Sequence, residues 1–438
     1  MRYLYVFFLL IPLSMFSQHS INGTFEPASD YTYAFLYHAT PSGSNYVDRA
    51  KIEENGKFTI ALDSSITSGI YKIVYALPPE ENNFNLIYNG KESVSFTFSI
   101  EKGLEFTDSN ENKLWSSYTN SMEMVNRTIS NYYTQKNIDK KGFHDIFKTL
   151  KDTQIAFEEA SEGTLASTFI KANTPYIPEV YEDVSTYSSN LKHTFLSHVD
   201  FSDELLQSSD FLVDRVLAYI FGMSPNTTND TYKANVDYVV TKISEGDLNI
   251  KTMLLEMVWS RFKDIDNPEV ANYISDTYLM ELSKIGNYIS LTEGIETYQK
   301  NQIGRKAQNF DLAISKNDET IATTLHDLEI AEQYLVIFWS STCGHCLDEL
   351  PKVKMILASN PNLKVVAIGL EDEAESWQKS ISEYPDFIHV LGLEKWDNPI
   401  SNAYGVEATP TYVLLDKNKT ILAKPYDFEA LEKVLKKK

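Results

Sequence analysis

The two cysteines of this chain, Cys343 and Cys346, lie in one four-residue window of a 438-residue sequence that contains no others. A secreted protein stabilised by disulfides usually has several cysteine pairs distributed along its length. A disulfide closing so short a loop would stabilise the fold little. A zinc ion would need two more ligands, and no further cysteine can supply them. We therefore expect redox chemistry from this pair, with no metal and no organic cofactor.

The residues around the cysteines predict a strand followed directly by a helix. Residues 334–339 form a continuous apolar run ending at Trp339, as expected for a strand buried on both faces. A helical pattern then extends over about residues 344–358. Unpaired backbone N–H groups and the positive end of the dipole stabilise an anion at a helix N-terminus. A thiolate at Cys343 is such an anion, so its pKa should fall below the value of about 8.5 for a free cysteine.

This placement predicts different roles for the two thiols. Cys346 follows Cys343 by one helical turn on the same face, within reach for disulfide closure. Cys343 is therefore the expected attacking thiol and Cys346 the resolving thiol. Gly344 and His345 lie between them and tune the reduction potential, because a polar or cationic His345 near the thiolate would stabilise the reduced form. Reduction of a client disulfide and oxidation of a client dithiol both remain open.

Three further segments accompany the Cys-Gly-His-Cys motif. Residues 303–310 are Ile-Gly-Arg-Lys-Ala-Gln-Asn-Phe, Leu350-Pro351 falls within the predicted helix, and residues 406–411 are Val-Glu-Ala-Thr-Pro-Thr. Together they resemble the TlpA/ResA-type thioredoxin-like thiol:disulfide oxidoreductases over residues 303–438, although Gln308 replaces the proline usual in that family. Strands and helices alternate over the same range. The resemblance implies an α/β thioredoxin-like fold that exchanges disulfides with client proteins outside the cytoplasm, often in cytochrome c maturation.

The resemblance also implies roles for residues beside the cysteines. Pro410 is expected in the cis configuration, leaving Thr409 able to pair with a client chain in extended form. Family members often keep a buried acid near the resolving thiol as a proton relay, and Glu371, after the predicted strand 363–370, is the candidate. A solvated carboxylate at a strand end is equally open for Glu371. Trp339 should either shape the surface beside Cys343 or simply pack.

Two other domains are predicted before residue 303. Residues 19–105 alternate apolar and polar side chains, and their Asn55-Gly56 and Asn89-Gly90 pairs predict hairpin turns, which together indicate an all-β antiparallel sandwich or barrel. Such a β domain of unknown function often precedes thioredoxin modules. In residues 106–300, apolar side chains recur at three and four positions, which predicts an all-α domain. The fold class is therefore multidomain.

The first 18 residues are expected to be an export signal. Arg2 precedes an uncharged, mostly apolar run from Leu4 to Phe16, and Ser17 is a small residue at a plausible cleavage point. The run is shorter than the ~20 residues needed to span a bilayer. We expect a periplasmic or otherwise extracytoplasmic protein, soluble after cleavage, with an uncleaved N-terminal anchor as the alternative.

The net charge of −22 disfavours nucleic acid and anionic membranes as partners. The expected partners are client proteins with disulfides or dithiols, and a membrane-linked thiol or disulfide partner that resets the pair. The alternative function is a ligand- or partner-binding protein in which the β and helical domains recognise the ligand and the thioredoxin module is secondary.

Overall fold

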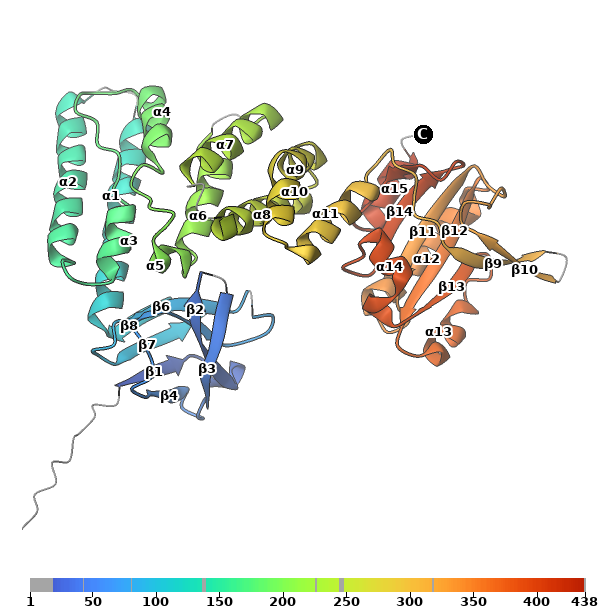
Figure 1. The fold of residues 1–438 in the computed structure, drawn as a ribbon, viewed down its shortest axis with the longest axis horizontal. Helices are drawn as coiled ribbons and strands as arrows, with labels where there is room; N and C mark the ends of the chain where they lie inside the picture. The colour runs from blue at the N-terminus through green and yellow to red at the C-terminus, as the bar shows by residue number, and fades with distance from the viewer. Residues whose placement is uncertain are drawn as a thin grey trace, which may run out of the picture. The chain divides into compact units, whose positions relative to one another are not determined.

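The computed structural model describes residues 19–41, 43–79, 81–135, 139–224, 227–243, 248–316 and 319–436. The chain divides after Leu279 into two compact units. The first contains eight strands followed by helices, and the second contains two helices followed by an α/β region (Figure 1). The predicted order of β, α and α/β structure is confirmed. The expected export signal, residues 1–18, lies outside the described residues.

Two four-stranded sheets form a sandwich at the start of the first unit. Their strand orders are β4-β1-β7-β8 and β3-β2-β5-β6. The strands are β1 (His19–Phe25), β2 (Tyr33–Thr40), β3 (Gly43–Lys51), β4 (Lys57–Leu62), β5 (Gly69–Val74), β6 (Asn83–Tyr88), β7 (Val94–Ser99) and β8 (Gly103–Asp108). One hydrophobic core joins the sheets, with Ile21 and Phe96 from one and Leu36 and Tyr71 from the other. The domain is therefore a sandwich, antiparallel except for the parallel pair of β1 and β7.

Both Asn-Gly pairs form turns, but the hairpins predicted from them are wrong. Gly56 and Gly90 have φ angles of 81° and 74°, the left-handed region that glycine adopts readily. The turn at Gly56 leads from β3 to β4, and the turn at Gly90 leads from β6 to β7. In each case the two strands belong to different sheets. The dipeptide determines the local reversal of the chain, whereas the choice of pairing partner depends on the sandwich core.

Helices make up the rest of the first unit. They are α1 (Asn110–Thr134), α2 (Lys140–Ala160), α3 (Ala166–Ala172), α4 (Val184–Thr194), α5 (Glu204–Gln207), α6 (Phe211–Leu217), α7 (Asn229–Lys242), α8 (Leu248–Asp264) and α9 (Pro268–Ile274), with π-helical turns at Ala218–Gly222 and Ser275–Leu279. Asn267 caps α9 by accepting a hydrogen bond from the backbone N–H of Val270 at 3.2 Å. This cap is one that the Asn-Pro sequence predicts.

The second unit is built on a five-stranded sheet of order β13-β12-β11-β14-β15. Its elements are α10 (Met280–Ile285), α11 (Ile289–Lys300), β9 (Asp311–Lys316), β10 (Glu319–Thr324), β11 (Gln333–Trp339), α12 (Gly344–Ser359), β12 (Leu363–Glu371), α13 (Ala374–Ile381), β13 (Ile388–Leu393), α14 (Pro399–Tyr404), β14 (Thr411–Asp416), β15 (Ile421–Ala423) and α15 (Phe428–Lys436). Strands β11, β12 and β13 are parallel, and β14 is antiparallel to β11. The hairpin of β9 and β10 projects from this sheet (Figure 1).

The central strand β11 is buried on both faces, as its apolar run predicts. Tyr334, Val336 and Phe338 belong to one hydrophobic cluster, and Leu335 and Trp339 belong to another. The second cluster includes residues of α12, so this helix packs on the face that Trp339 occupies. Because α12 starts only five residues after β11 ends, the loop between them lies at the carboxyl edge of the parallel strands.

Candidate functional site

Cys343 is the N-cap residue of α12. Its extended backbone precedes the first helical residue, Gly344, and its Sγ accepts a hydrogen bond from the backbone N–H of Cys346 at 3.3 Å. The sulfur thus takes the place of the side-chain oxygen that usually satisfies a free N–H at this point of a helix. The predicted strand, loop and helix around the cysteines are confirmed.

The two sulfur atoms are 2.6 Å apart, and both cysteines are free thiols. The Cys346 thiol donates its hydrogen to the sulfur of Cys343. Cys346 is fully buried, whereas Cys343 is partly exposed. An approaching disulfide can therefore reach Cys343 but not Cys346, which is the arrangement that an attacking and a resolving thiol require.

The surroundings separate the acidities of the two thiols. Burial alone would raise the pKa of Cys343, but hydrogen bonds from the Cys346 thiol and from backbone N–H groups of Cys346 and His345 outweigh it and lower that pKa. Burial, together with the hydrogen bond that it donates to Cys343, raises the pKa of Cys346 to about 12. The imidazole of His345 is exposed, and the backbone N–H of this residue is one of the groups that lower the pKa of Cys343. Negative charge in this pair is consequently carried by Cys343.

The Thr409–Pro410 peptide bond is cis, as the resemblance implies. The carbonyl oxygen of Thr409 lies 3.5 Å from the sulfur of Cys343, which donates to it in the thiol form. Thr409 is half-buried, and within the described residues its backbone N–H donates to no protein group. A backbone group open in this way beside the attacking sulfur can pair with an extended client chain.

Glu371 is buried at the end of β12, with 2% of its surface exposed, so the interpretation as a solvated carboxylate is wrong. Its two oxygens accept hydrogen bonds from the backbone N–H of Ser341 and from the hydroxyl of Ser340. Those two residues lie in the loop between β11 and α12. The contacts of Glu371 therefore hold the loop that leads to Cys343, and none of them reaches Cys346.

A second buried acid, which the sequence analysis missed, lies on α12 itself. Glu349 is 8% exposed and accepts a 2.6 Å hydrogen bond from the hydroxyl of Tyr412. Its other oxygen accepts from the backbone N–H of Phe428 at 3.5 Å. Burial, followed by the hydrogen bond to Glu349, raises the pKa of Tyr412, and the charge of Cys346 contributes to that rise. Tyr412 and the resolving cysteine also belong to the same hydrophobic cluster.

The spacing of Glu349 could have identified it from sequence. It follows Cys346 by three residues, so the two side chains share one face of the helix, with Cβ atoms about 5–6 Å apart. Both face the core of the sheet. Trp339 lies in the same hydrophobic cluster as Cys346 and is fully buried, so packing is its role there. A Cβ atom at position 344 would meet no heavy atom within 4 Å, so a larger residue than Gly344 would fit there without displacing a neighbour.

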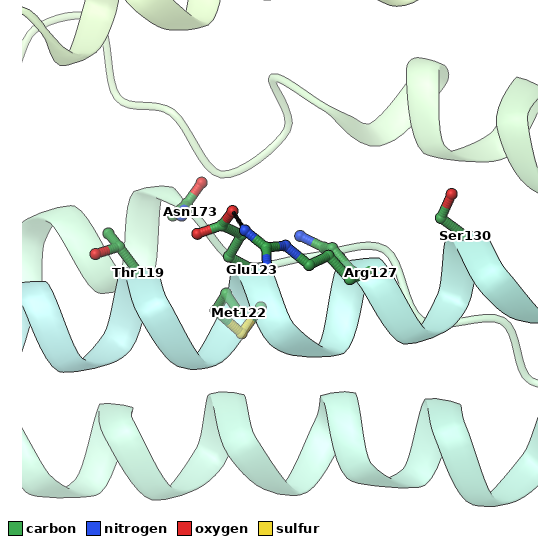
Figure 2. Close-up of a pocket in the computed structure, with 7 residues that line it drawn as sticks. Thr119, Met122, Glu123, Arg127, Ser130 and Asn173 are labelled. Carbon is green, nitrogen blue, oxygen red and sulfur yellow. Dashed lines mark hydrogen bonds and ion pairs between the residues drawn. The ribbon is translucent and has the colours of Figure 1, made fainter.

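Among the described residues, no group of three or more His, Cys, Asp and Glu side chains is arranged to hold a metal ion. In the same part of the chain, no helix has the length and apolar character needed to cross a membrane. An open hollow in the first unit is lined by side chains of α1 and by Asn173, and Glu123 and Arg127 form an ion pair within it (Figure 2). The cysteines lie in the other unit.

A family model described as thioredoxin-like matches residues 332–421, the range from β11 to β15 that contains both cysteines and Pro410. The C-terminal part of this chain contains a thioredoxin-like domain. The predicted thioredoxin-like fold of this part is therefore confirmed. Relatives of this family support a redox function in general terms, and the dithiol at the start of α12 is the feature that such a function needs.

Solved structures are similar to parts of the chain. A thioredoxin-like protein from Bacteroides caccae is 20% identical, covering 60% of this chain and 96% of that protein, with a TM-score of 0.42. The thioredoxin domain of a thiol-disulfide oxidoreductase from Bacteroides vulgatus is 23% identical over 31% of this chain and 96% of its own, with a TM-score of 0.27. A domain of a possible thiol-disulfide isomerase from Cytophaga hutchinsonii is 30% identical over 31% and 92%, with a TM-score of 0.26. No curated protein matches this sequence.

Proposed function

We propose that this protein is a thiol:disulfide oxidoreductase that exchanges disulfides with client proteins. The observation that carries the proposal is the contrast between two sulfurs 2.6 Å apart, one partly exposed with a lowered pKa and one buried with a raised pKa. A pair of this kind separates nucleophilic attack from resolution, since only the thiolate is nucleophilic.

The reductive cycle takes two steps. The Cys343 thiolate attacks one sulfur of the client disulfide, which forms a mixed disulfide and releases the other client sulfur as a thiolate. Cys346 then loses its proton and attacks the sulfur of Cys343, releasing the second client thiolate. The client disulfide gains two electrons and two protons, and the protein ends with a Cys343–Cys346 disulfide. Reversal of both steps oxidises a client dithiol.

The second step needs a proton acceptor, because burial keeps the Cys346 thiol protonated near neutral pH. Glu349 is suited to this role because it is a buried carboxylate one helical turn further along the same face of α12. The hydroxyl of Tyr412 holds one of its oxygens in place. The hydrogen bonds of Glu371, which we predicted as the relay, are made with Ser340 and Ser341 in the loop before Cys343 and not with Cys346. We therefore assign proton acceptance to Glu349.

The cellular setting is part of the proposal. The apolar N-terminal run supports export to the periplasm or another extracytoplasmic compartment. A membrane-linked thiol or disulfide partner would then reset the cysteine pair after each cycle. The relation to cytochrome c maturation comes only from the resemblance to TlpA/ResA-type proteins.

Insulin reduction tests the proposal directly. Wild-type protein supplied with a dithiol reductant should accelerate reduction of the insulin disulfides, and Cys343→Ser should abolish the acceleration. Without the reductant, Cys346→Ser should stall after attack and accumulate mixed disulfides with insulin. Adding the reductant should cleave them. An inactive wild type, or equal activity in Cys343→Ser, would favour a binding protein whose thioredoxin module is secondary.

A further inference from the structure

Two large apolar side chains remain exposed at the end of β13. Leu393 is 45% exposed and Trp396, in the turn that follows, is 43% exposed. We propose that these side chains and the carboxylates around them form a docking surface for a basic, apolar segment of the client protein next to its disulfide. This inference rests on the proposed function and specifies the class of client that the site accepts.

The sheet register places this surface beside the attacking cysteine. Trp339 of β11 is paired with Gly369 of β12, and Glu371 at the end of β12 is paired with Leu393 at the end of β13. All three parallel strands therefore end at the edge where Cys343 caps α12. Neighbouring strands are about 4.8 Å apart, so the end of β13 lies roughly 10 Å from that of β11. An extended client chain covers this distance in about three residues.

Hydrogen bonds from buried side chains fix the turn that carries Trp396. Asn398 is buried and donates a hydrogen bond to the carbonyl oxygen of Leu393 at 2.9 Å. The hydroxyl of Ser401, which is fully buried, donates to the carbonyl oxygen of Asn398 at 2.8 Å. Glu394 and Lys395 both have positive φ angles, 68° and 46°, which reverse the chain. Trp396 is thus presented to solvent by an ordered turn and loses little freedom on contact with a client.

Charge selects the partner of this surface. The loops after β12 and β13 expose the carboxylates of Asp372, Glu373 and Glu394, and Glu407 is exposed in the loop before β14, on the other side of β11. Lys395 is the one cation in residues 371–375, 393–397 and 406–409, and it is already paired with Asp372 at 3.5 Å. A client segment with lysine or arginine is attracted to such a surface, whereas an acidic segment is repelled. Apolar side chains of the same segment can cover Trp396 and Leu393.

The test uses pre-reduced full-length protein in single turnovers with synthetic disulfide peptides. One peptide carries Lys-Leu three residues from its cysteine, and the second carries Glu-Leu at the same place. Rates are measured by acid quench and thiol alkylation. Each is divided by the rate with bis(2-hydroxyethyl) disulfide, which is uncharged and too small to extend from Cys343 to β13. This division removes differences in thiol chemistry from the comparison.

We expect the Lys-Leu peptide to react about tenfold faster than the Glu-Leu peptide at low salt. The advantage should shrink as the ionic strength approaches about 1 M, where charges separated by more than about 3 Å are screened. Glu373→Gln combined with Glu394→Gln should remove most of the advantage. Glu329→Gln combined with Glu332→Gln, the same loss of charge before β11 begins, should retain it. Trp396→Ala should slow both peptides at least threefold relative to the small disulfide.

Three results would overturn the docking surface: equal rates for the two peptides with wild type, equal loss in the two double variants, or unchanged peptide rates in Trp396→Ala. A wild type that reduces the small disulfide but shows any of these results retains the proposed function without this client preference. A wild type that fails to reduce the small disulfide loses the proposed function itself.

Discussion

The hydroxyl of Tyr412 donates a 2.6 Å hydrogen bond to the carboxylate of Glu349 in the core beneath the cysteine pair. The two residues come from β14 and α12, 63 positions apart in the chain, and both are buried. Buried carboxylates are rare unless they are paired or functional. Tyr412 and Cys346 belong to the same hydrophobic cluster, so this pair lies in the core that also contains the resolving thiol.

The role of Glu349 predicts a selective defect in the second step of the exchange. Glu349→Gln keeps the shape and an acceptor for Tyr412 but removes the base. General bases typically contribute 10²–10⁴-fold, so resolution of the mixed disulfide should slow by about 100-fold near pH 7. The defect should shrink as pH rises, because hydroxide can remove the Cys346 proton directly. Rapid-quench measurement of mixed-disulfide decay between pH 6 and 9 checks this.

Asp348 supplies the matched control for that experiment, because it is the exposed neighbour of Glu349 on α12. The mixed disulfide of Asp348→Asn should decay at the wild-type rate over the same pH range. Tyr412→Phe should show an intermediate defect, since the carboxylate stays but loses the hydroxyl that orients it. A defect in Glu349→Gln that is the same at every pH would indicate altered packing rather than a lost base.

The contrast between the two thiols predicts their order of alkylation. Cys343 is partly exposed with a lowered pKa, so iodoacetamide should modify it first, and its rate should be half-maximal at a pH below the value of about 8.5 for a free cysteine. Cys346 should resist modification throughout this range, because burial raises its pKa to about 12. Mass spectrometry of peptides alkylated at successive pH values measures both rates.

Cys346→Ser tests the cause of that lowered pKa. Serine offers a hydroxyl in place of the thiol that donates to Cys343, and it leaves the backbone N–H at this position intact. The alkylation midpoint of Cys343 should therefore stay below that of a free cysteine. Cys346→Ala removes the side-chain donor, so its midpoint should be higher than in Cys346→Ser. Identical midpoints in the two variants would assign the effect to backbone N–H groups alone.

The sequence predicted the active-site loop because its signals are local. A buried apolar strand, an N-cap cysteine and a helix beginning at Gly344 follow from residues 334–358 alone. Pro410 lies 67 positions after Cys343 and was placed beside it through resemblance to a family. The partner of Glu371 was missed because a hydrogen bond from Ser341, 30 positions away, depends on the register of β11 and β12.

The sandwich shows the same limit at the level of whole strands. Alternating apolar side chains predicted the strands, and Gly56 and Gly90 predicted where the chain turns. Neither signal specifies the partner strand, because each sheet face offers similar apolar contacts. The parallel pairing of β1 with β7 joins residues 73 positions apart, such as Ile21 and Val94, and is determined by the shared core of the two sheets.

Substitutions of Glu371 should separate a positioning role of this residue from a role in proton transfer. Glu371→Ala leaves the Ser341 backbone N–H and the Ser340 hydroxyl without their acceptor, and an unsatisfied buried group costs about 1–3 kcal/mol. This loss should loosen the loop before Cys343. Hydrogen exchange at the Ser341 amide should accelerate by roughly one to two orders of magnitude, since 1.4 kcal/mol corresponds to about tenfold.

Glu371→Gln keeps an oxygen for the Ser341 N–H, so most of the protection from exchange should remain in that variant. A proton relay would give the opposite pattern, because glutamine lacks a base and should then resolve the mixed disulfide as slowly as alanine does. Equal mixed-disulfide decay in Glu371→Gln and wild type, together with fast amide exchange only in Glu371→Ala, would establish the positioning role. Slow decay of the mixed disulfide in Glu371→Gln would instead identify Glu371 as the acceptor of the Cys346 proton. Glu349 would then be only a structural partner of Tyr412.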